Sequence, residues 1–209
     1  MNSNIYLVNP EEDPEYWNKM AYSLTAEGKL DKARYYYEKA LDVDPDNKCA
    51  LNNLANIFLE RGKKEDALKY LKYVVTLYPD SVEPIINLGV YYQENGDLDK
   101  ARDYYNKAKN LHSNNAALWH NSGRIYYMEN NLTEAVSDYI ESLRLRPGDI
   151  DTLLDKGIAH IKLSEVEEAD KCFDEILIID PDNKSALHLK SAIAYTREME
   201  GEEDDVSLA

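Results

Sequence analysis

The chain has 209 residues, of which 44% are hydrophobic, and a formal net charge of −16. A negative field of this size repels phosphate backbones and anionic membrane surfaces, so we expect neither nucleic acid nor lipid as a partner. No apolar stretch approaches the roughly 18 residues that a membrane span needs, and the N-terminus lacks the basic and apolar regions of a signal peptide. The two cysteines, Cys49 and Cys172, are expected to be unpaired packing residues, which favours a reducing, cytoplasmic location.

Most of the chain is predicted to consist of paired helices. An acidic segment, residues 1–13, is followed by five stretches of 34 residues without insertions: 14–47, 48–81, 82–115, 116–149 and 150–183. Apolar residues at spacings of three and four predict two helices in each stretch. Residues 184–200 repeat the first half of the pattern and are predicted to form one more polar capping helix. The charged remainder, 201–209, is predicted to be disordered.

Small and large residues occupy fixed places in every stretch. The eighth position is Ala or Gly (Ala21, Ala55, Gly89, Gly123, Gly157), and the twenty-fourth is large (Tyr37, Leu71, Tyr105, Tyr139, Phe173). The twentieth position is always Ala. This pattern predicts that the two helices of a pair approach closely, with the large residue packed on the small one.

Helix-ending residues stand between the predicted helices. A residue that can adopt the left-handed conformation follows each first helix: Gly28, Gly62, Gly96, Asn130 and Ser164. The phrase DPDNK occurs at 44–48 and again at 180–184. Its proline stops one helix, and its Asp and Asn side chains can cap the next. We therefore interpret DPDNK as a junction between helix pairs and not as a catalytic signature.

The period and pattern together resemble the tetratricopeptide repeat across residues 14–183. The stretch 116–149 matches best, and 150–183 departs most, with Lys156, His160 and Ser164 where Leu, an aromatic residue and Gly are expected. The resemblance implies an all-α fold, a right-handed α-solenoid whose concave groove is lined by the first helix of each pair. It also implies a non-catalytic scaffold that binds a peptide segment of a partner protein in that groove. The alternative is a self-associating platform that forms homo-oligomers.

Sequence motifs for catalysis are missing. The chain contains no Gly-rich phosphate loop, no GxSxG, no HExxH and no paired-Cys metal spacing. We therefore predict no enzymatic activity, no cofactor and no bound metal.

Asparagines recur at one groove position of the implied fold. Asn53, Asn87 and Asn121 stand at the sixth place of three successive stretches. A carboxamide both donates and accepts hydrogen bonds, so three of them at regular steps can hold the main chain of an extended peptide. The arrangement resembles the asparagine ladder of some members of the family, and Asn56 belongs to the same polar half of the groove. The alternative is that Asn is simply common at this position.

The second half of the implied groove is apolar, with Tyr127, Leu154 and Ile158. Such a patch marks a binding site, unless the capping helix folds over Leu154 and Ile158. His120 and Arg124 lie four residues apart beside Asn121, where they can receive a carboxylate from a ligand. The alternative is a solvated pair without a ligand.

Overall fold

The computed structural model describes residues 10–111 and 114–207, with side chains as far as residue 196. Residues 1–9, most of the predicted acidic segment, lie outside the described residues. Within the described ranges the chain forms eleven α-helices and one short 3-10 helix, η1 (Pro10–Glu12), and no strand. The chain divides into two compact units, Met1–Leu111 (unit 1) and His112–Ala209 (unit 2).

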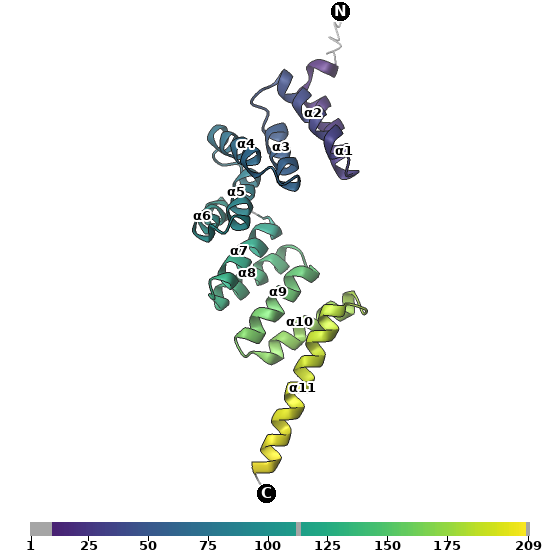
Figure 1. The fold of residues 1–209 in the computed structure, drawn as a ribbon, viewed down its shortest axis with the longest axis vertical. Helices are drawn as coiled ribbons and strands as arrows, with labels where there is room; N and C mark the ends of the chain where they lie inside the picture. The colour runs from purple at the N-terminus through teal and green to yellow at the C-terminus, as the bar shows by residue number, and fades with distance from the viewer. Residues whose placement is uncertain (1–9, 112–113, 208–209) are drawn as a thin grey trace, which may run out of the picture. The chain divides into compact units, whose positions relative to one another are not determined.

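Each predicted 34-residue stretch contains one antiparallel helix pair (Figure 1). The pairs of unit 1 are α1 (Pro14–Ala26) with α2 (Leu30–Val43), α3 (Lys48–Glu60) with α4 (Lys64–Leu77), and α5 (Val82–Glu94) with α6 (Leu98–Asn110). Unit 2 contains α7 (Ala116–Met128) with α8 (Leu132–Leu145), α9 (Ile150–Lys162) with α10 (Val166–Ile179), and the last helix α11 (Lys184–Ser207).

The predicted close approach within each pair is present. A Cβ atom on Gly123 would lie 2.6 Å from Cε1 of Tyr139, and one on Gly157 would lie 2.5 Å from Cε1 of Phe173. Only glycine therefore fits beneath these rings without a shift of the ring or of a helix. The same positions are also fully buried in the other pairs: Ala21 with Tyr37, Ala55 with Leu71, and Tyr105 beside Gly89.

The ends of the first helices have the predicted left-handed residue. The φ angles are 71° at Gly28, 69° at Gly62, 76° at Gly96, 62° at Asn130 and 61° at Ser164. In each case the next N–H donates to a carbonyl five residues back, as Lys29 N does to Leu24 O at 2.9 Å. This hydrogen bond closes the last turn and reverses the chain direction.

The two DPDNK junctions form the same hydrogen bonds. Asn47 Oδ1 accepts from Ala50 N at 3.1 Å, and Asn47 Nδ2 donates to Asp44 at 3.2 Å. At the second junction Asn183 Oδ1 accepts from Ala186 N at 3.1 Å, and its Nδ2 donates to Asp180 at 3.1 Å. The interpretation of the phrase as helix punctuation is confirmed, because its asparagine caps the next helix both times.

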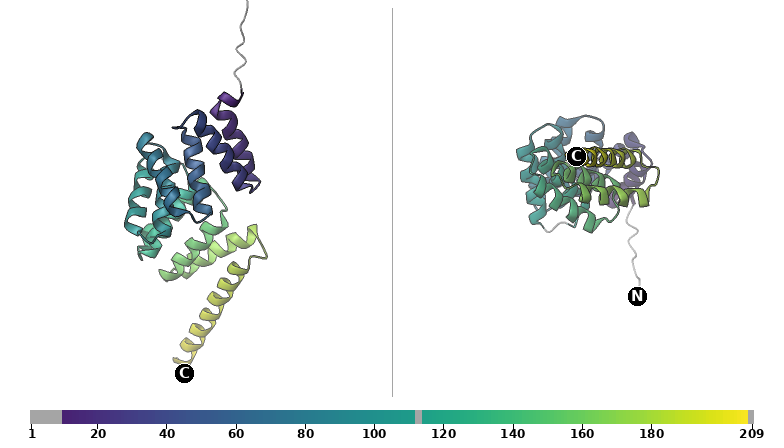
Figure 2. Two further views of the ribbon diagram at one scale, coloured as in Figure 1. Left: turned by 45° about the horizontal axis from the view of Figure 1, so that its top comes forward. Right: turned by 90° about the horizontal axis from the view of Figure 1, so that it is seen from below.

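The last helix is longer than the sequence analysis predicted. α11 continues to Ser207, so residues 201–207 are helical where we predicted a disordered tail, and residues 208–209 lie outside the described residues. Its final turns project away from α9 and α10 in Figure 1 and in the left view of Figure 2. Position 198, where a helix-ending residue would stand in the repeat, is Glu, and the acidic residues that follow are mostly good helix formers. The stop signal of the repeat is therefore absent at position 198, and the helix continues through Gly201.

Candidate binding surfaces on the first helices

The first helices of successive pairs contact each other within each unit, α3 with α5 in unit 1 and α7 with α9 in unit 2. We call the exposed side of α3 and α5 the asparagine surface. The hollow beside α7 and α9 is called the Tyr127 pocket. The two are described separately because they belong to different units.

The asparagine surface is held together by the predicted ladder residue Asn87. Its Nδ2 donates to Oδ1 of Asn52 at 2.9 Å and to Oδ1 of Asn56 at 2.8 Å, so both N–H groups are used within the protein. Among the described residues, no hydrogen bond reaches Oδ1 of Asn87. This oxygen is the part of the side chain that is left to accept an N–H from a ligand.

The other two ladder residues have looser surroundings. Asn53 is half-buried on α3, and its Nδ2 donates to Sγ of Cys49 in the same helix at 3.3 Å. A thiol is a weak acceptor, so this contact holds the carboxamide only loosely. Asn121 is half-buried on α7 in unit 2. The ladder itself stays a prediction, because its members are divided between the two units.

The Tyr127 pocket has a volume of about 340 Å³. Three predicted site residues, Arg124, Tyr127 and Ile158, line it together with Met128, Tyr139 and Asp155. The side chains come from α7, α8 and α9. Burial raises the pKa of the Tyr139 hydroxyl, and the nearby negative charge of Asp155 adds to the effect, so this hydroxyl stays neutral at physiological pH. The pocket thus combines apolar walls with one carboxylate and one guanidinium.

Asp155 is the internal partner of the two residues predicted to receive a carboxylate, His120 and Arg124. Its Oδ2 lies 2.8 Å from Nε2 of His120 and 3.9 Å from Nε of Arg124. The Arg124 side chain is still 51% exposed, whereas that of His120 is 19% exposed. A carboxylate from a ligand would therefore compete with Asp155, and Arg124 is the more accessible of the two donors. The alternative of the sequence analysis, in which His120 and Arg124 only face solvent, did not include their contacts with Asp155.

Lys162 adds a further cation to the Tyr127 pocket. Its Nζ lies 4.3 Å from the centroid of the Tyr127 ring, within cation–π distance.

The two apolar residues predicted in α9 have different surroundings. Leu154 packs against the buried cluster that contains Ala186 and Ile193 of α11, so the last helix partly covers it. Ile158 lines the Tyr127 pocket instead. The capping-helix alternative thus applies to Leu154, which shares a cluster with α11 residues, and not to Ile158, whose pocket has no α11 residue among its lining side chains.

One periodic signal would have found both polar pairings. Asn52 and His120 stand at the fifth position of their stretches, and their partners Asn87 and Asp155 stand at the sixth position of the next. Each pair is therefore 35 residues apart. A comparison of these two positions across neighbouring repeats would have pointed to both pairs, although Asn18 at the fifth position of the first stretch pairs with Asn47 instead.

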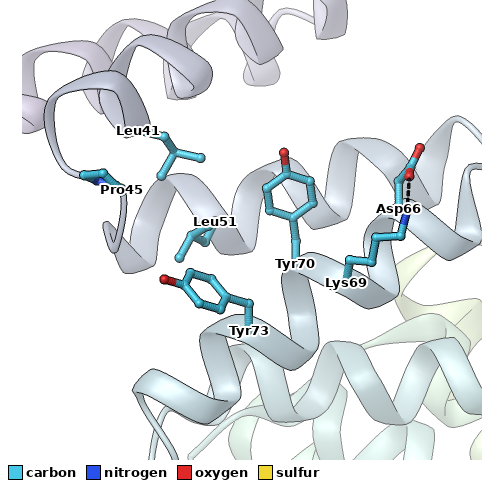
Figure 3. Close-up of a pocket in the computed structure, with 7 residues that line it drawn as sticks. All are labelled: Leu41, Pro45, Leu51, Asp66, Lys69, Tyr70 and Tyr73. Atoms are coloured by element: carbon cyan, nitrogen blue, oxygen red, sulfur yellow. Dashed lines mark hydrogen bonds and ion pairs between the residues drawn. The ribbon is translucent and has the colours of Figure 1, made fainter.

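A further pocket in unit 1 was not predicted from the sequence. It has a volume of about 570 Å³ and is lined by Leu41, Pro45, Leu51, Asp66, Lys69, Tyr70 and Tyr73 (Figure 3). Lys69 is paired with Asp66 at 3.2 Å, and the hydroxyl of Tyr73 donates to Asp46 at 2.5 Å. Since these polar groups are paired, the pocket offers mainly apolar contacts. The signal for it was the high tyrosine content, 17 residues, which predicts half-buried rings.

The described side chains include no group of three or more His, Cys, Asp or Glu residues that could hold a metal ion. Among the described helices, none is both long and apolar enough to cross a membrane.

Comparison with known proteins identifies the repeat. Two family models described as tetratricopeptide repeat match the chain, one at residues 24–72 and 58–125 and the other at 116–149. No curated protein sequence matched the chain.

Several solved structures share the fold. The structure of YrrB, described as a TPR protein with an unusual peptide-binding site, is 23% identical with a TM-score of 0.65, over 87% of this chain and 93% of that one. The structure of pilF from Pseudomonas aeruginosa is 19% identical with a TM-score of 0.81, over 90% and 86%. TTC0263, a thermophilic TPR protein of Thermus thermophilus, is 21% identical with a TM-score of 0.67, over 87% and 97%. These likenesses confirm the predicted fold class, an all-α solenoid of helix-turn-helix repeats.

Proposed function

Because this chain belongs to the tetratricopeptide repeat family, whose fold typically serves non-catalytic protein–protein interaction, we propose that it binds a peptide segment of a partner protein on its first helices. The buried faces of the repeat helices hold the solenoid together, and their exposed side chains remain available to contact a partner protein. YrrB is described as having a peptide-binding site of its own, and its likeness to this chain supports the fold alone. In this proposal the chain is a cytoplasmic scaffold, in keeping with its two free cysteines.

The observation that carries the proposal is the Tyr127 pocket. Arg124, Tyr127 and Ile158 were selected from the repeat register alone, and they line one hollow. Its volume of about 340 Å³ suits one medium to large apolar side chain of a peptide. The exposed guanidinium of Arg124 at its edge can donate to a main-chain carbonyl or to a carboxylate of the same peptide.

The charges around the Tyr127 pocket narrow the ligand further. Arg124 lines the pocket beside Asp155, the ammonium group of Lys162 lies against the Tyr127 ring, and the charge of Asp138 also acts on Tyr139. The charges around the pocket are thus of both signs, which favours an uncharged anchor residue, and the net charge of −16 opposes a strongly acidic peptide. We propose an apolar anchor residue with a polar or acidic neighbour as the recognised motif.

The asparagine surface of unit 1 contributes main-chain contacts in this proposal. Oδ1 of Asn87 accepts a peptide N–H, and the loosely held carboxamide of Asn53 donates and accepts. The carboxamide of Asn121 on α7 can make the same contacts in unit 2. Each net hydrogen bond is worth about 0.5–1.5 kcal/mol, so these contacts support the anchor and do not replace it.

A random peptide library displayed on phage would supply ligands, and isothermal titration would then measure their affinity. We expect Ile158→Glu to weaken binding by about 30-fold or more, because a charge replaces the wall that holds the anchor residue. Ile140→Glu is the matched control, since Ile140 is an exposed isoleucine on the second helix α8 and should leave the affinity unchanged.

Peptides that bind with the same affinity to the Ile158→Glu variant would place the site elsewhere on the molecule. The pair Asn53→Ala with Asn121→Ala then tests the main-chain contacts, with an expected loss of about 1–3 kcal/mol if both contact the ligand. Asn87→Ala needs a parallel measurement of stability, because it also leaves the carboxamide oxygens of Asn52 and Asn56 without their donor.

A further inference from the structure

One face of α11 is exposed along the described part of the helix. Six residues share this face: Lys184, Leu187, His188, Ser191, Ala194 and Tyr195. Leu187 is 45% exposed and Tyr195 is 65% exposed, although both are large and apolar. The opposite face, with Ala186 and Ile193, packs into the core of unit 2. We call the exposed face the α11 seam.

Two residues of the α11 seam stand at positions that neighbouring helices largely cover in the other first helices, whereas Tyr195 stands at the twelfth position, where Ile161 of α9 is also 37% exposed. Leu187 and Ser191 stand at the fourth and eighth positions of the repeat. The fourth-position residue Leu153 of α9 is 1% exposed, because α10 lies over it. No second helix follows α11 in the described part of the chain, which ends at residue 207. Within the described residues, Leu187 and Ser191 are therefore uncovered on this face.

The five helix pairs show what such a face binds. Each second helix carries Ala at the twentieth position and a large residue four places later, and the large residue lies over the small eighth residue of the first helix. α11 contains the same pattern in Ser191 and Tyr195, a small residue and an aromatic ring four places apart. One helix thus presents the small site of a first helix and the ring of a second helix on one face.

We propose that two copies of this chain associate through their α11 seams, with the helices antiparallel and Tyr195 of each copy packed over Ser191 of the other. Such a contact is isologous, because each copy supplies the same surface and a two-fold axis relates them. The Ser191 hydroxyl already donates to Leu187 O in its own helix at 2.9 Å, so it brings no unpaired donor into the contact.

Charge selects the antiparallel arrangement. The seam begins with Lys184 and His188, and the sequence becomes acidic toward the other end, with Glu198, Glu200, Glu202, Glu203, Asp204 and Asp205. Position 202 lies 18 residues, or five helical turns, after position 184 and therefore on the same face. Antiparallel pairing sets the acidic end of each helix beside Lys184 of the other copy, whereas parallel pairing would oppose the two acidic ends.

The contact is small, so the association is expected to depend on protein concentration. A helix pair of this length buries less than a standard protein–protein interface, which gives a dissociation constant on the order of 10 µM. The proposal does not depend on peptide binding, since the α11 seam shares no residue with the Tyr127 pocket or the asparagine surface.

Sedimentation equilibrium of the full chain between about 1 and 300 µM measures the association. We expect a reversible monomer–dimer equilibrium that Tyr195→Asp weakens at least tenfold, because a charge replaces the packed ring. Tyr22→Asp is the matched control: Tyr22 is 69% exposed on α1, and its replacement should leave the equilibrium unchanged. Helical circular dichroism of both variants reports that the fold is intact.

Cross-linking tests the orientation in a Cys49→Ser background, which removes the exposed native thiol. Chains with Lys184→Cys and chains with Glu202→Cys are mixed and treated with a short bis-maleimide. Antiparallel pairing gives the mixed product, whereas parallel pairing gives products of like chains. A monomer at every concentration, a dimer unaffected by Tyr195→Asp, or a predominance of like-with-like products would each overturn the proposal.

Discussion

The close contact between Gly123 and Tyr139 makes the packing of α7 on α8 testable by adding one methyl group. In Gly123→Ala the new Cβ would lie 2.6 Å from Cε1 of Tyr139 and 3.2 Å from the backbone oxygen of Ala135. Ordinary contact begins at 3.4 Å, so the ring or the helix must move by about 0.8 Å (3.4 minus 2.6).

Two opposing effects determine how much Gly123→Ala changes the free energy of unfolding. Overpacking of a buried site costs about 1–3 kcal/mol. Alanine is favoured over glycine in a helix interior by about 1 kcal/mol, and Gly123 lies in the middle of α7. We therefore expect Gly123→Ala to lower the free energy of unfolding of unit 2 by about 1 kcal/mol. Overpacking exceeds the gain in helix propensity because one of the close contacts is backbone.

The chain allows a selective assay, because it contains only two tryptophans, Trp17 and Trp119. Trp119 lies in α7, and Trp17 lies in unit 1. In a Trp17→Phe background, urea unfolding followed by fluorescence therefore reports on the helix that carries the substitution.

A second substitution tests whether the ring is the cause. The second repeat already combines Ala55 with Leu71 at these two positions. Tyr139→Leu alone should cost about 2–3 kcal/mol through the cavity it leaves. In the double variant we expect a favourable coupling of about 1–2 kcal/mol. Stabilisation by Gly123→Ala, or additive effects of the two substitutions, would refute the packing argument.

Three further outcomes follow from local contacts. Ser164→Gly should raise the free energy of unfolding by about 1 kcal/mol in urea titrations, because Ser164 has a φ of 61°. Asn130→Gly should raise the free energy of unfolding by less, since Asn tolerates this conformation better. Cys172 is buried, and burial raises the pKa of its thiol, so it should resist iodoacetamide until unit 2 unfolds. Mass spectrometry after pulsed alkylation measures this protection. Rapid labelling of the native chain would contradict the expectation. Burial opposes ionisation of Asp149, but hydrogen bonds from Thr152 and Arg146 outweigh this effect and lower the pKa of Asp149 in the folded chain. The ionised Asp149 therefore stabilises the fold above the pKa of the unfolded chain, about 3.9, and this stabilisation is lost as the pH falls through the folded pKa. Urea midpoints of Asp149→Asn between pH 7 and 2.5 should lack that part of the acid-induced loss; an acid response identical to that of the parent chain would count against the assignment.

The fold could be predicted from the sequence because its determinants are local and recur. Gly28 and its equivalents end a helix by their own backbone conformation, and Asn47 caps the next helix within three residues. Knowledge of the distant partners was not needed for either feature. The 34-residue period then repeats the same local solution five times.

The details of the candidate site depend on side chains that are distant in sequence. Whether His120 faces solvent or Asp155, and whether Asn87 faces a ligand or Asn56, depends on how two successive first helices are placed. Composition also proved a poor guide to residues 201–207, which are helical although their acidic character suggested disorder. Ile158 could be selected from its position because the Tyr127 pocket lies on the first-helix side.

The identical DPDNK junctions make the length of the solenoid adjustable. The interval from Lys48 to Asn183 is 136 residues, four whole repeats, and both of its ends are bounded by the same capped turn. A recombination event between the two copies would remove or duplicate these four repeats and still restore an intact junction, with Asn47 or Asn183 capping whichever helix comes next. A chain of this kind can become shorter or longer by four whole repeats, because the same capped turn connects the helices at both places.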